Sequence, residues 1–203
     1  MTDMFSDFNS CGESVDEIFE EMDCSGQRIG EKEFEGCHFV DCDFREAEFV
    51  GCRFTDCKFL RCEMSLMKVP GVGLMGVEFE ECKVVGVDWT AGSWSDYSQC
   101  CLLKFKACVM NSCSLMGLRL EKLVIEDCRS HGMDMRGGVY WGADFRGSDF
   151  LNAMIGGTDL SGADFRGARN YRIDLRDNVL KGTKFSRFEA VSLLTCLGIE
   201  LED

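Results

Sequence analysis

The sequence has few of the residues and segments on which enzymes and membrane proteins depend. It contains two histidines, His38 and His131, and neither belongs to a nucleophile, phosphate-loop or metal-ligand motif. No apolar run approaches the length of a transmembrane helix, and the first ten residues lack a basic region before an apolar one. We therefore expect a cytoplasmic protein that is not an enzyme, needs no cofactor and does not contact a membrane.

Positive charge is also scarce. The chain has 22 Lys and Arg against 36 Asp and Glu, a formal net charge of −14, so direct binding to nucleic acid is disfavoured. The acidic excess is concentrated in residues 1–70, which contain seventeen acidic and seven basic residues. Such a surface either keeps the protein soluble or imitates the phosphates of a nucleic acid.

A third absence concerns cysteine spacing. The chain has 14 cysteines but no C-x-x-C pair, which disfavours a zinc site. Nine of them occupy one position of the repeat described below, where a thiol packs as a small hydrophobic side chain. These are Cys37, Cys42, Cys52, Cys57, Cys62, Cys82, Cys108, Cys113 and Cys128. We expect them to be buried and unbridged, and we expect no metal.

Residues 34–59 contain a strict repeat. Phenylalanine recurs every five residues at positions 34, 39, 44, 49, 54 and 59, and a Cys or Ala precedes each of the last five by two residues. Neither a helix nor an ordinary alternating strand has this period, which indicates a repeat architecture. Residues two apart in an extended segment share a face, so each Phe and its small partner point inward while the chain turns between repeats.

The period of five extends through most of the chain. It holds from Ile29 to Trp94, slips over the next ten residues, and returns from Phe105 to Phe185 with local irregularities. We expect an N-terminal cap over 1–18 and a repeat domain over 19–185, with a small loop near 95–104. Ser14 and Glu17 also resemble a capping box, so residues 14–22 could instead form a short helix that plugs the first coil.

The C-terminal residues 186–203 have a different pattern. Ser186 and Glu189 resemble a second capping box, followed by an apolar helical stripe, and Ile199–Glu202 alternates like a strand. A helix this short must pack on something, either the last coil or a second copy of the chain. We expect a dimerisation module whose contact residues are Phe188, Val191, Leu194, Leu197, Ile199 and Leu201.

The most regular repeats are Ala143–Gly147, Ser148–Phe150, Thr158–Gly162 and Ala163–Gly167. They resemble the consensus of the pentapeptide-repeat family: a small residue, Asp or Asn, Leu or Phe, a small or polar residue, and often Gly. The resemblance implies an all-β fold, a right-handed quadrilateral parallel β-helix with four repeats per coil, here followed by a short C-terminal α-helix. About thirty repeats would give about eight coils.

The segments NYRIDLRDNVLKGTKFS (170–186) and FEAVSLLTCLGIELED (188–203) are similar to one branch of this family. That branch contains the quinolone-resistance (Qnr-like) proteins and the immunity proteins that accompany topoisomerase-poisoning natural products such as albicidin. The resemblance implies a homodimer joined through the C-terminal helix and an acidic surface that imitates DNA for DNA gyrase or topoisomerase IV. The unbroken phase up to Trp94 leaves no room for long loops, which favours the immunity type.

The repeat phase places several carboxylates on the outside of the rod. We predict that they form an acidic face for the partner: Glu33, Glu35, Asp41, Asp43, Glu46, Glu48, Asp56 and Glu63. The leading hypothesis is a DNA-mimicking protein that binds a type II topoisomerase. The alternative is a structural or protein-interaction rod with an unrelated cytoplasmic partner. A secreted or membrane-linked protein is disfavoured by the free thiols and the missing signal segment.

Overall fold

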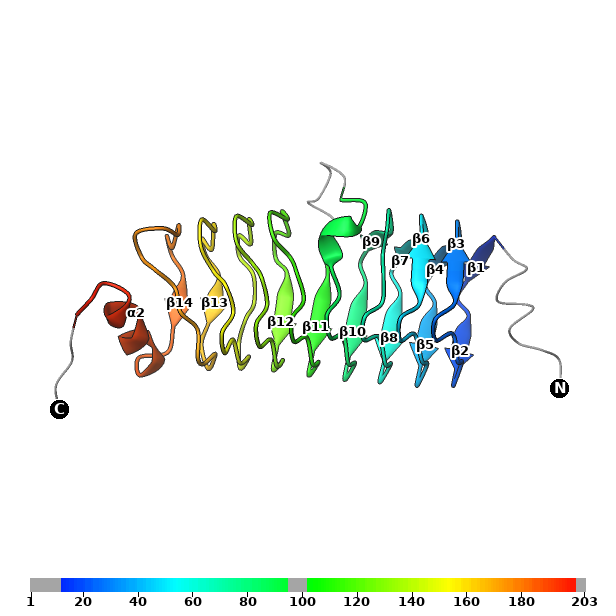
Figure 1. The fold of residues 1–203 in the computed structure, drawn as a ribbon, viewed down its shortest axis with the longest axis horizontal. Helices are drawn as coiled ribbons and strands as arrows, with labels where there is room; N and C mark the ends of the chain where they lie inside the picture. Colours follow the sequence, from blue (N-terminus) through cyan, green and yellow to red (C-terminus); the bar gives the residue numbers. More distant parts are fainter. Residues whose placement is uncertain (1–11, 95–101, 200–203) are drawn as a thin grey trace.

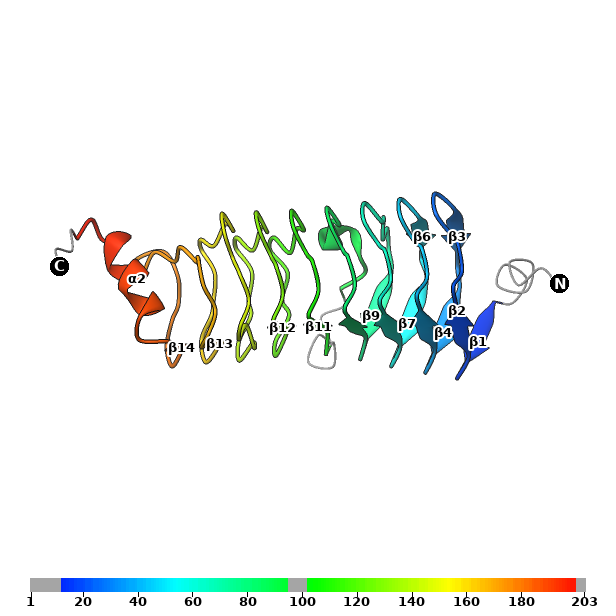
Figure 2. The same cartoon turned by 90° about the horizontal axis from the view of Figure 1, so that it is seen from below.

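The chain folds into a straight rod of stacked coils (Figure 1). The structure, a computed structural model, describes residues 12–94 and 102–199. The coils follow one another along the rod in sequence order, so its two ends are formed by the N-terminal and C-terminal parts of the chain (Figure 2). A surface that is continuous along the rod therefore combines residues from several successive coils.

The strands are short because each covers one side of a coil. Most have three residues, and a buried central side chain lies between two outward ones. The strands are β1 Glu13–Val15, β2 Ile18–Glu20, β3 Arg28–Gly30, β4 Glu33–Glu35, β5 His38–Val40, β6 Glu48–Val50, β7 Arg53–Thr55, β8 Lys58–Leu60, β9 Gly73–Met75, β10 Glu78–Glu80, β11 Lys104–Lys106, β12 Val124–Glu126, β13 Asp164–Phe165 and β14 Lys184–Phe185.

Strand pairing shows that most coils contain four repeats. Most strands pair in parallel with one that lies twenty residues further on, as in Phe34 with Phe54 and Phe39 with Phe59. Ladders run along two sides in the orders β1-β4-β7-β9 and β2-β5-β8-β10-β11-β12. The pair β3–β6 and isolated bridges continue the other two sides. The predicted four-sided parallel β-helix of about eight turns is confirmed.

Most corners of the coil contain a residue in the left-handed region of backbone space. Many corners use Gly, for example Gly147 with φ +69°, but fifteen described residues other than Gly also adopt φ between 51° and 60°. Leu66 is the bulkiest aliphatic side chain among them, with φ 60°. Because this conformation costs an L-residue about 1–2 kcal/mol, the stacking energy of the coils must offset it.

Aromatic rings form continuous stacks inside the rod. Successive rings on one side lie 4.6 Å (Phe39 to Phe59), 4.9 Å (Phe59 to Phe79) and 4.8 Å (Phe79 to Phe105) apart, with interplanar angles of about 10°. The ring spacing matches the strand spacing of a parallel sheet, so backbone pairing and ring stacking reinforce each other. Because an inward side chain is needed at every fifth residue, large apolar residues recur in the sequence with a period of five.

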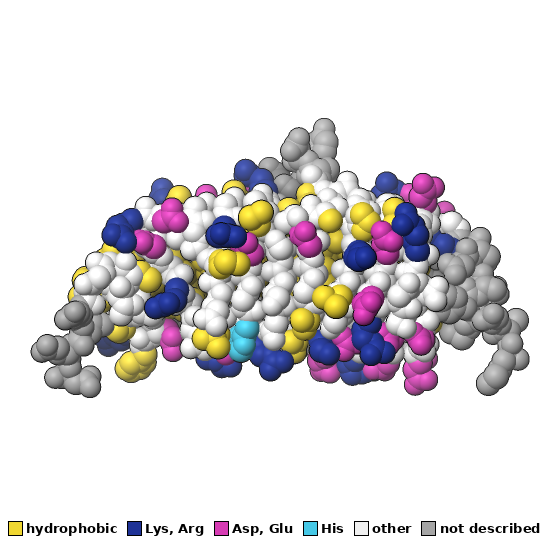
Figure 3. Space-filling view, viewed as in Figure 1, with side chains coloured by type: hydrophobic (Ala, Val, Ile, Leu, Met, Phe, Trp, Pro, Cys, Tyr) yellow, Lys and Arg dark blue, Asp and Glu magenta, His cyan; other side chains and the backbone are white. Residues whose placement is uncertain are grey.

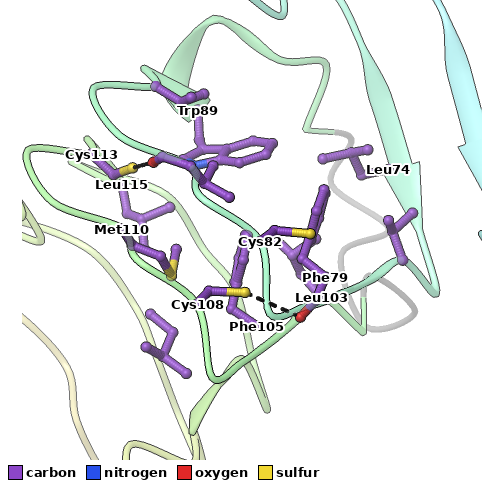
Figure 4. Close-up of a cluster of buried hydrophobic side chains, with 14 of the residues drawn as sticks. Leu74, Phe79, Cys82, Trp89, Leu103, Phe105, Cys108, Met110, Cys113 and Leu115 are labelled. Atoms are coloured by element: carbon purple, nitrogen blue, oxygen red, sulfur yellow. Dashed lines mark hydrogen bonds between the residues drawn. The ribbon is translucent and has the colours of Figure 1, made fainter. Parts of the chain in front are cut away.

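The cysteines behave as predicted. All nine at the small inward position are buried and unbridged, as is Cys24. Their thiols donate hydrogen bonds to nearby carbonyls; the Cys57 thiol lies 3.3 Å from the oxygens of both Phe34 and Thr55. Figure 4 shows three of these thiols, on Cys82, Cys108 and Cys113, among the rings and aliphatic side chains of the core.

Burial also changes the acidity of these thiols. Desolvation raises the pKa of Cys24 and of Cys57 to about 12, and that of Cys113 to about 11. A thiol that stays protonated at neutral pH is a poor metal ligand and a poor nucleophile. The expectation that cysteines of the core serve packing rather than chemistry therefore has a physical basis at Cys24, Cys57 and Cys113.

The phase slip corresponds to one enlarged coil. Strand β10 pairs with β11 through Glu78 and Lys104, a separation of 26 rather than 20 residues. This coil contains the 3-10 helix η1, Trp89–Ala91, and the half-buried Trp94, whose Nε1 donates to the Trp89 carbonyl at 2.7 Å. The predicted loop near 95–104 falls mostly outside the described residues, which resume at 102.

The N-terminal boundary differs from the prediction. The alternative of a helix over 14–22 is wrong, because these residues contribute to β1 and β2, which pair with β4 and β5. The β-helix therefore begins by Glu13, earlier than the expected start at residue 19. Backbone pairing outweighs the local capping signal: the Asp16 amide donates to the Glu35 carbonyl at 2.8 Å in the next coil. Residues 1–11 of the predicted cap lie outside the described residues.

The C-terminal helix is shorter than expected. It consists of the 3-10 turn η3, Glu189–Val191, and the α-helix α2, Ser192–Thr195. The predicted capping box does not form, because Ser186 Oγ instead accepts from the Gly167 amide at 2.7 Å. The strand expected at 199–202 lies outside the described residues except for Ile199. Within 12–94 and 102–199, no helix has the length and apolarity needed to cross a membrane.

Candidate functional site

The eight predicted carboxylates do not share one face of the rod. Glu33 and Glu35 lie on the side built by β1, β4, β7 and β9, whereas Asp43 and Glu63 lie on a side formed by isolated bridges. The remaining four lie on the fourth side or at corners: Asp41, Glu46, Glu48 and Asp56. Each repeat turns the chain by about a quarter of a coil, so the expectation of a single acidic face was wrong. They form an acidic band around the rod.

Ion pairs offset part of this charge. Five of the eight carboxylates pair with Lys or Arg: Glu33 with Arg53, Asp41 with Arg61 (2.6 Å), Asp43 with Arg45 (2.5 Å), Glu48 with Arg28 (3.0 Å) and Glu63 with Lys83 (3.0 Å). Four of these partners lie twenty residues away, directly above or below in the stack. Glu35, Glu46 and Asp56 have no ion pair among the described residues. Exposed pairs add little stability, but they reduce the charge that a partner meets.

Ion pairs lower the pKa of three of these carboxylates. Hydrogen bonds from Arg61 lower the pKa of Asp41, and those from Arg45 lower the pKa of Asp43. Partial burial opposes this effect at Glu63, but hydrogen bonds from Ser65 and Lys83 still lower its pKa. Asp41, Asp43 and Glu63 therefore keep their charge to lower pH than an unpaired carboxylate would.

The strongest acidic cluster was missing from the sequence-based list. Residues 12–27 contain six exposed carboxylates and no Lys or Arg, and none of the six is ion-paired among the described residues: Glu13, Asp16, Glu17, Glu20, Glu21 and Asp23. We call this group the acidic first coil. The signal that could have found it is the count of eight acids against one base in residues 1–28.

The second half of the rod is closer to neutral. Several Asp–Arg pairs are two positions apart in the sequence, with an inward side chain between them, and the two residues form an ion pair. The N–O distance is 2.6 Å in Asp144–Arg146 and in Asp164–Arg166. The pairs Asp134–Arg136 and Asp174–Arg176 repeat the arrangement at 2.7 Å. Figure 3 shows the resulting mixture of positive and negative side chains on one face of the rod. The charge that distinguishes this protein is therefore concentrated toward its N-terminal end.

A shallow groove interrupts the acidic band. It has a volume of about 670 Å³, and Glu46, Glu48, Lys68 and Asp88 line it together with apolar atoms of Leu66, Pro70 and Ala91. The Leu66 side chain is exposed. Three carboxylates against one lysine around an apolar floor suit a cationic side chain with an aliphatic stem.

The C-terminal segment presents an apolar face. Leu193 is buried and Ala190 packs against the core, which fixes the orientation of η3 and α2. Arg176 donates to the Cys196 carbonyl at 3.1 Å and ties the end of the helix to the last coil. The opposite side of the segment is exposed: Phe188 (90%), Val191, Leu194, Leu197 and Ile199. Five of the six predicted dimer residues thus point outward, while Leu201 lies outside the described residues.

Comparison with protein families decides the classification. A pentapeptide-repeat region model matches residues 32–104, and a model of eight pentapeptide repeats matches residues 132–168. The two matches together span more than half of the chain. The chain belongs to the pentapeptide-repeat family. A search of curated proteins found no match.

Solved structures show the same architecture for this pentapeptide-repeat protein. A trypsin-treated form of QnrB1, described as a plasmid-mediated fluoroquinolone resistance protein, has a TM-score of 0.62 and 21% identity, over 97% of this chain and 93% of that chain. Full-length QnrB1 has a TM-score of 0.59 and 21% identity, over 93% of this chain and all of that chain. At this level of identity the likeness concerns the fold.

The histidines of this pentapeptide-repeat protein are not brought together. His38 is exposed on β5, whereas His131 Nε2 lies 3.3 Å from Asp149. Burial opposes ionisation of Asp149, but hydrogen bonds with Asn170, His131 and Arg169 lower its pKa to about 2. Among the described residues, no group of three or more His, Cys, Asp or Glu side chains is arranged to hold a metal ion. We interpret the Asp149 network as structural.

Proposed function

We propose that this pentapeptide-repeat rod binds a type II topoisomerase, DNA gyrase or topoisomerase IV, in place of DNA and protects it from a poisoning antibiotic. The observation that carries the proposal is the acidic first coil, six carboxylates without ion pairs at one end of a narrow rod. The fold likeness to QnrB1, a fluoroquinolone resistance protein, supports it. A topoisomerase holds DNA in a basic groove, which would attract such a surface.

Charge density supports the comparison with DNA. Two chains with a net charge of −14 each would carry −28, and two stacks of about eight coils at about 4.8 Å, with their ends, would span about 80–90 Å. That is about one charge per 3 Å, whereas duplex DNA carries one per about 1.7 Å. The dimer would therefore present about half the linear charge of DNA.

We propose that the dimer forms through the exposed C-terminal apolar face. An isologous contact covers the same patch on both subunits, and a large aromatic such as Phe188, 90% exposed in one chain, is a typical anchor for it. This arrangement would place one acidic first coil at each far end of the assembly. A long groove on the enzyme could then meet both ends at once.

The proposed role is binding without catalysis and without a cofactor, in the cytoplasm where a topoisomerase acts. We favour the immunity type over general quinolone protection. The described coils up to Asp88 keep the twenty-residue register and carry no inserted loop. The partner would then have to be recognised by the sides and ends of the rod itself.

The direct test is a gyrase supercoiling assay with and without a topoisomerase poison. We expect the wild-type protein to restore supercoiling in the presence of the poison. A variant with Glu20→Lys and Glu21→Lys should restore less, because it removes charge from the acidic first coil. If the wild-type protein leaves poisoned gyrase unchanged and does not bind the enzyme, the proposed function is wrong.

One observation favours the alternative of a rod that binds an unrelated protein. The neutral second half exposes several large apolar side chains, among them Met116 (50%), Trp141 (49%) and Val179 (53%). Exposed aromatic and Met side chains are enriched in protein contacts. A Trp141→Ala variant that loses its cellular partner while it still binds gyrase would point to this second surface.

A further inference from the structure

The shallow groove of about 670 Å³ is built by three successive coils. Its lining includes the corner residues Glu46, Leu66 and Gly86, which follow one another at intervals of twenty residues and all have positive φ. The 3-10 helix η1 of the enlarged coil contributes Ala91. The groove therefore exists only because the coils stack, and it belongs to the rigid part of the rod.

Leu66 is the least expected residue of this lining. It has φ 60°, a conformation that Gly adopts without strain, and its side chain is 54% exposed. Neither the backbone of the corner nor the burial of apolar surface therefore favours leucine at this position. The side chain reaches over the next corner, because a Cβ on Gly86 would lie 2.8 Å from Leu66 Cδ2. An apolar surface kept exposed at this cost is typical of a contact with another molecule.

Two carboxylates of the lining are available to such a molecule. Glu46 and Asp88 are exposed and have no ion pair among the described residues. Thr90 fixes the orientation of Asp88, since its amide and its hydroxyl donate to Oδ1 at 3.0 Å and 2.6 Å. The Oδ2 atom of Asp88 is left to accept from a donor outside the chain.

The other charged side chains of the groove limit the charge of its occupant. Glu48 is bound to Arg28 at 3.0 Å, and Lys68, its register partner, is exposed without an ion pair among the described residues. The carboxylates of Glu46, Glu48 and Asp88 against these two cations give −3 + 2 = −1. A net charge of −1 suits one cationic side chain and not a run of them.

We propose that the groove binds an arginine side chain of the partner protein. Its aliphatic stem would lie on Leu66 and Pro70, and its guanidinium would donate to Asp88, with Glu46 adding attraction. A guanidinium is planar and weakly hydrated, so it packs on apolar atoms and still binds a carboxylate, whereas the ammonium of lysine is strongly hydrated. The inference deepens the proposed function and rests on it only for the identity of the partner.

Other occupants fit the groove less well. Residues 1–11, 95–101 and 200–203 contain no Lys or Arg, so the parts of the chain outside the described residues do not supply the cation. An arginine of a second copy would make a heterologous contact, which generates rings or open filaments. A nucleic acid would be repelled by the carboxylates. A basic protein surface, such as the DNA-binding groove of a topoisomerase, meets none of these conflicts.

The first test is an NMR titration of the full chain with acetyl-arginine amide as the probe. We expect the amides of Leu66, Gly86 and Asp88 to shift at millimolar probe, and acetyl-lysine amide to shift them less. The groove variant, Glu46→Gln with Asp88→Asn, should raise the Kd of the probe at least about fivefold, because a charge-assisted hydrogen bond is lost. Asn retains an oxygen that can accept from Thr90.

The matched control is Glu35→Gln with Asp56→Asn. It removes the same charge from two exposed carboxylates of the acidic band that have no ion pair among the described residues. Asp56 precedes Leu66 by ten residues, half a coil, so it lies at the opposite corner of the rod. The control should leave the Kd of the arginine probe nearly unchanged.

The second test uses Leu66→Gly, which separates binding from stability. Gly relieves the backbone strain, so the variant should unfold at a urea concentration no lower than that of wild type. It also removes the apolar floor, so it should bind gyrase about fivefold more weakly although its charge is unchanged. Uniform imitation of DNA predicts no loss for this variant, and it predicts equal losses for the groove variant and the control.

Four results would overturn the inference. The groove is not a site if the arginine probe shifts the amides of the acidic first coil more than those of the groove, or if the groove variant and the control lose equal affinity. Arginine is the wrong occupant if the lysine probe shifts the same amides equally. A second copy is the occupant if the mass in light scattering rises with concentration and the groove variant prevents this.

Failure of the proposed function gives a different pattern. If the arginine probe binds in the groove but the wild-type protein does not bind gyrase, the proposed function is wrong and the groove remains a site for an arginine of another protein. If gyrase binds and Leu66→Gly binds it as tightly as wild type, the proposed function stands and the groove takes no part in it.

Discussion

The cysteine-rich core should make the fold sensitive to alkali. In the unfolded chain a thiol releases its proton near its ordinary pKa of 9.0, whereas burial raises the pKa of Cys24 and Cys57 to about 12 and that of Cys113 to about 11. Above pH 9 the unfolded state therefore binds fewer protons than the folded state. By linkage, the free energy of unfolding must fall as pH rises through this window.

The magnitude follows from the size of the shifts. At pH 10 each of these three thiols should destabilise the fold by about 1.4 kcal/mol, so together they should remove about 4 kcal/mol. That is a large part of a typical net stability of about 5–15 kcal/mol. Burial also raises the pKa of Cys37 and Cys52, which adds to the effect in the same direction.

The assay is urea unfolding under reducing conditions at pH 7.5 and pH 10, for wild type and Cys57→Ala. At pH 7.5 the free energy of unfolding of Cys57→Ala should be about 1 kcal/mol lower than that of wild type, because the substitution leaves a cavity. Between pH 7.5 and pH 10 it should fall by about 1.4 kcal/mol less than that of wild type. Cys196→Ala, which removes a half-buried thiol outside the solenoid core, is the matched control. If wild type is equally stable at both pH values, or Cys57→Ala leaves the pH dependence unchanged, the reasoning is refuted.

Three further predictions concern packing and assembly. In a thiol titration of the native protein, at most four of the fourteen thiols should react fast; rapid reaction of most of them would contradict the inward placement. Leu194→Glu with Leu197→Glu should convert the dimer to a monomer in light scattering, because the charges would be buried in the contact; a wild-type mass would refute that contact. Gly138→Ala should lower the unfolding free energy by more than about 1 kcal/mol, because its Cβ would lie 2.3–2.6 Å from atoms of the buried Tyr140 side chain, whereas Gly12→Ala has open space and should cost less; equal losses would show that the packing around this ring is not tight.

The fold was predictable because one signal repeats throughout the chain. Phenylalanines such as Phe39 and Phe59 recur at a period that neither helices nor ordinary strands have, and the stacked rings confirm why. The burial of Cys57 followed from the same phase. Local capping signals at Ser14 and Ser186 were misleading, because pairing with the next coil and the hydrogen bond from Gly167 use these residues differently.

The candidate site was only partly predictable. The outward position of residues such as Asp41 and Glu46 followed from the phase, but their distribution over different sides depends on how far each repeat turns. Ion pairs such as Asp41 with Arg61 join residues twenty apart, which become neighbours only when the coils stack. The sequence shows the total charge, but it does not show which carboxylates are offset by ion pairs with Lys or Arg.

The most direct test of the central claim is the affinity for gyrase measured at several salt concentrations. Wild type is compared with Glu20→Lys, Glu21→Lys in the acidic first coil, and with Glu81→Lys, Asp127→Lys, two exposed carboxylates without described ion pairs in the middle of the rod. We predict that wild-type affinity falls as salt rises, and that the first-coil variant binds more weakly and with less salt dependence than the mid-rod control. Equal affinities without salt dependence would contradict imitation of DNA and leave a plain interaction rod.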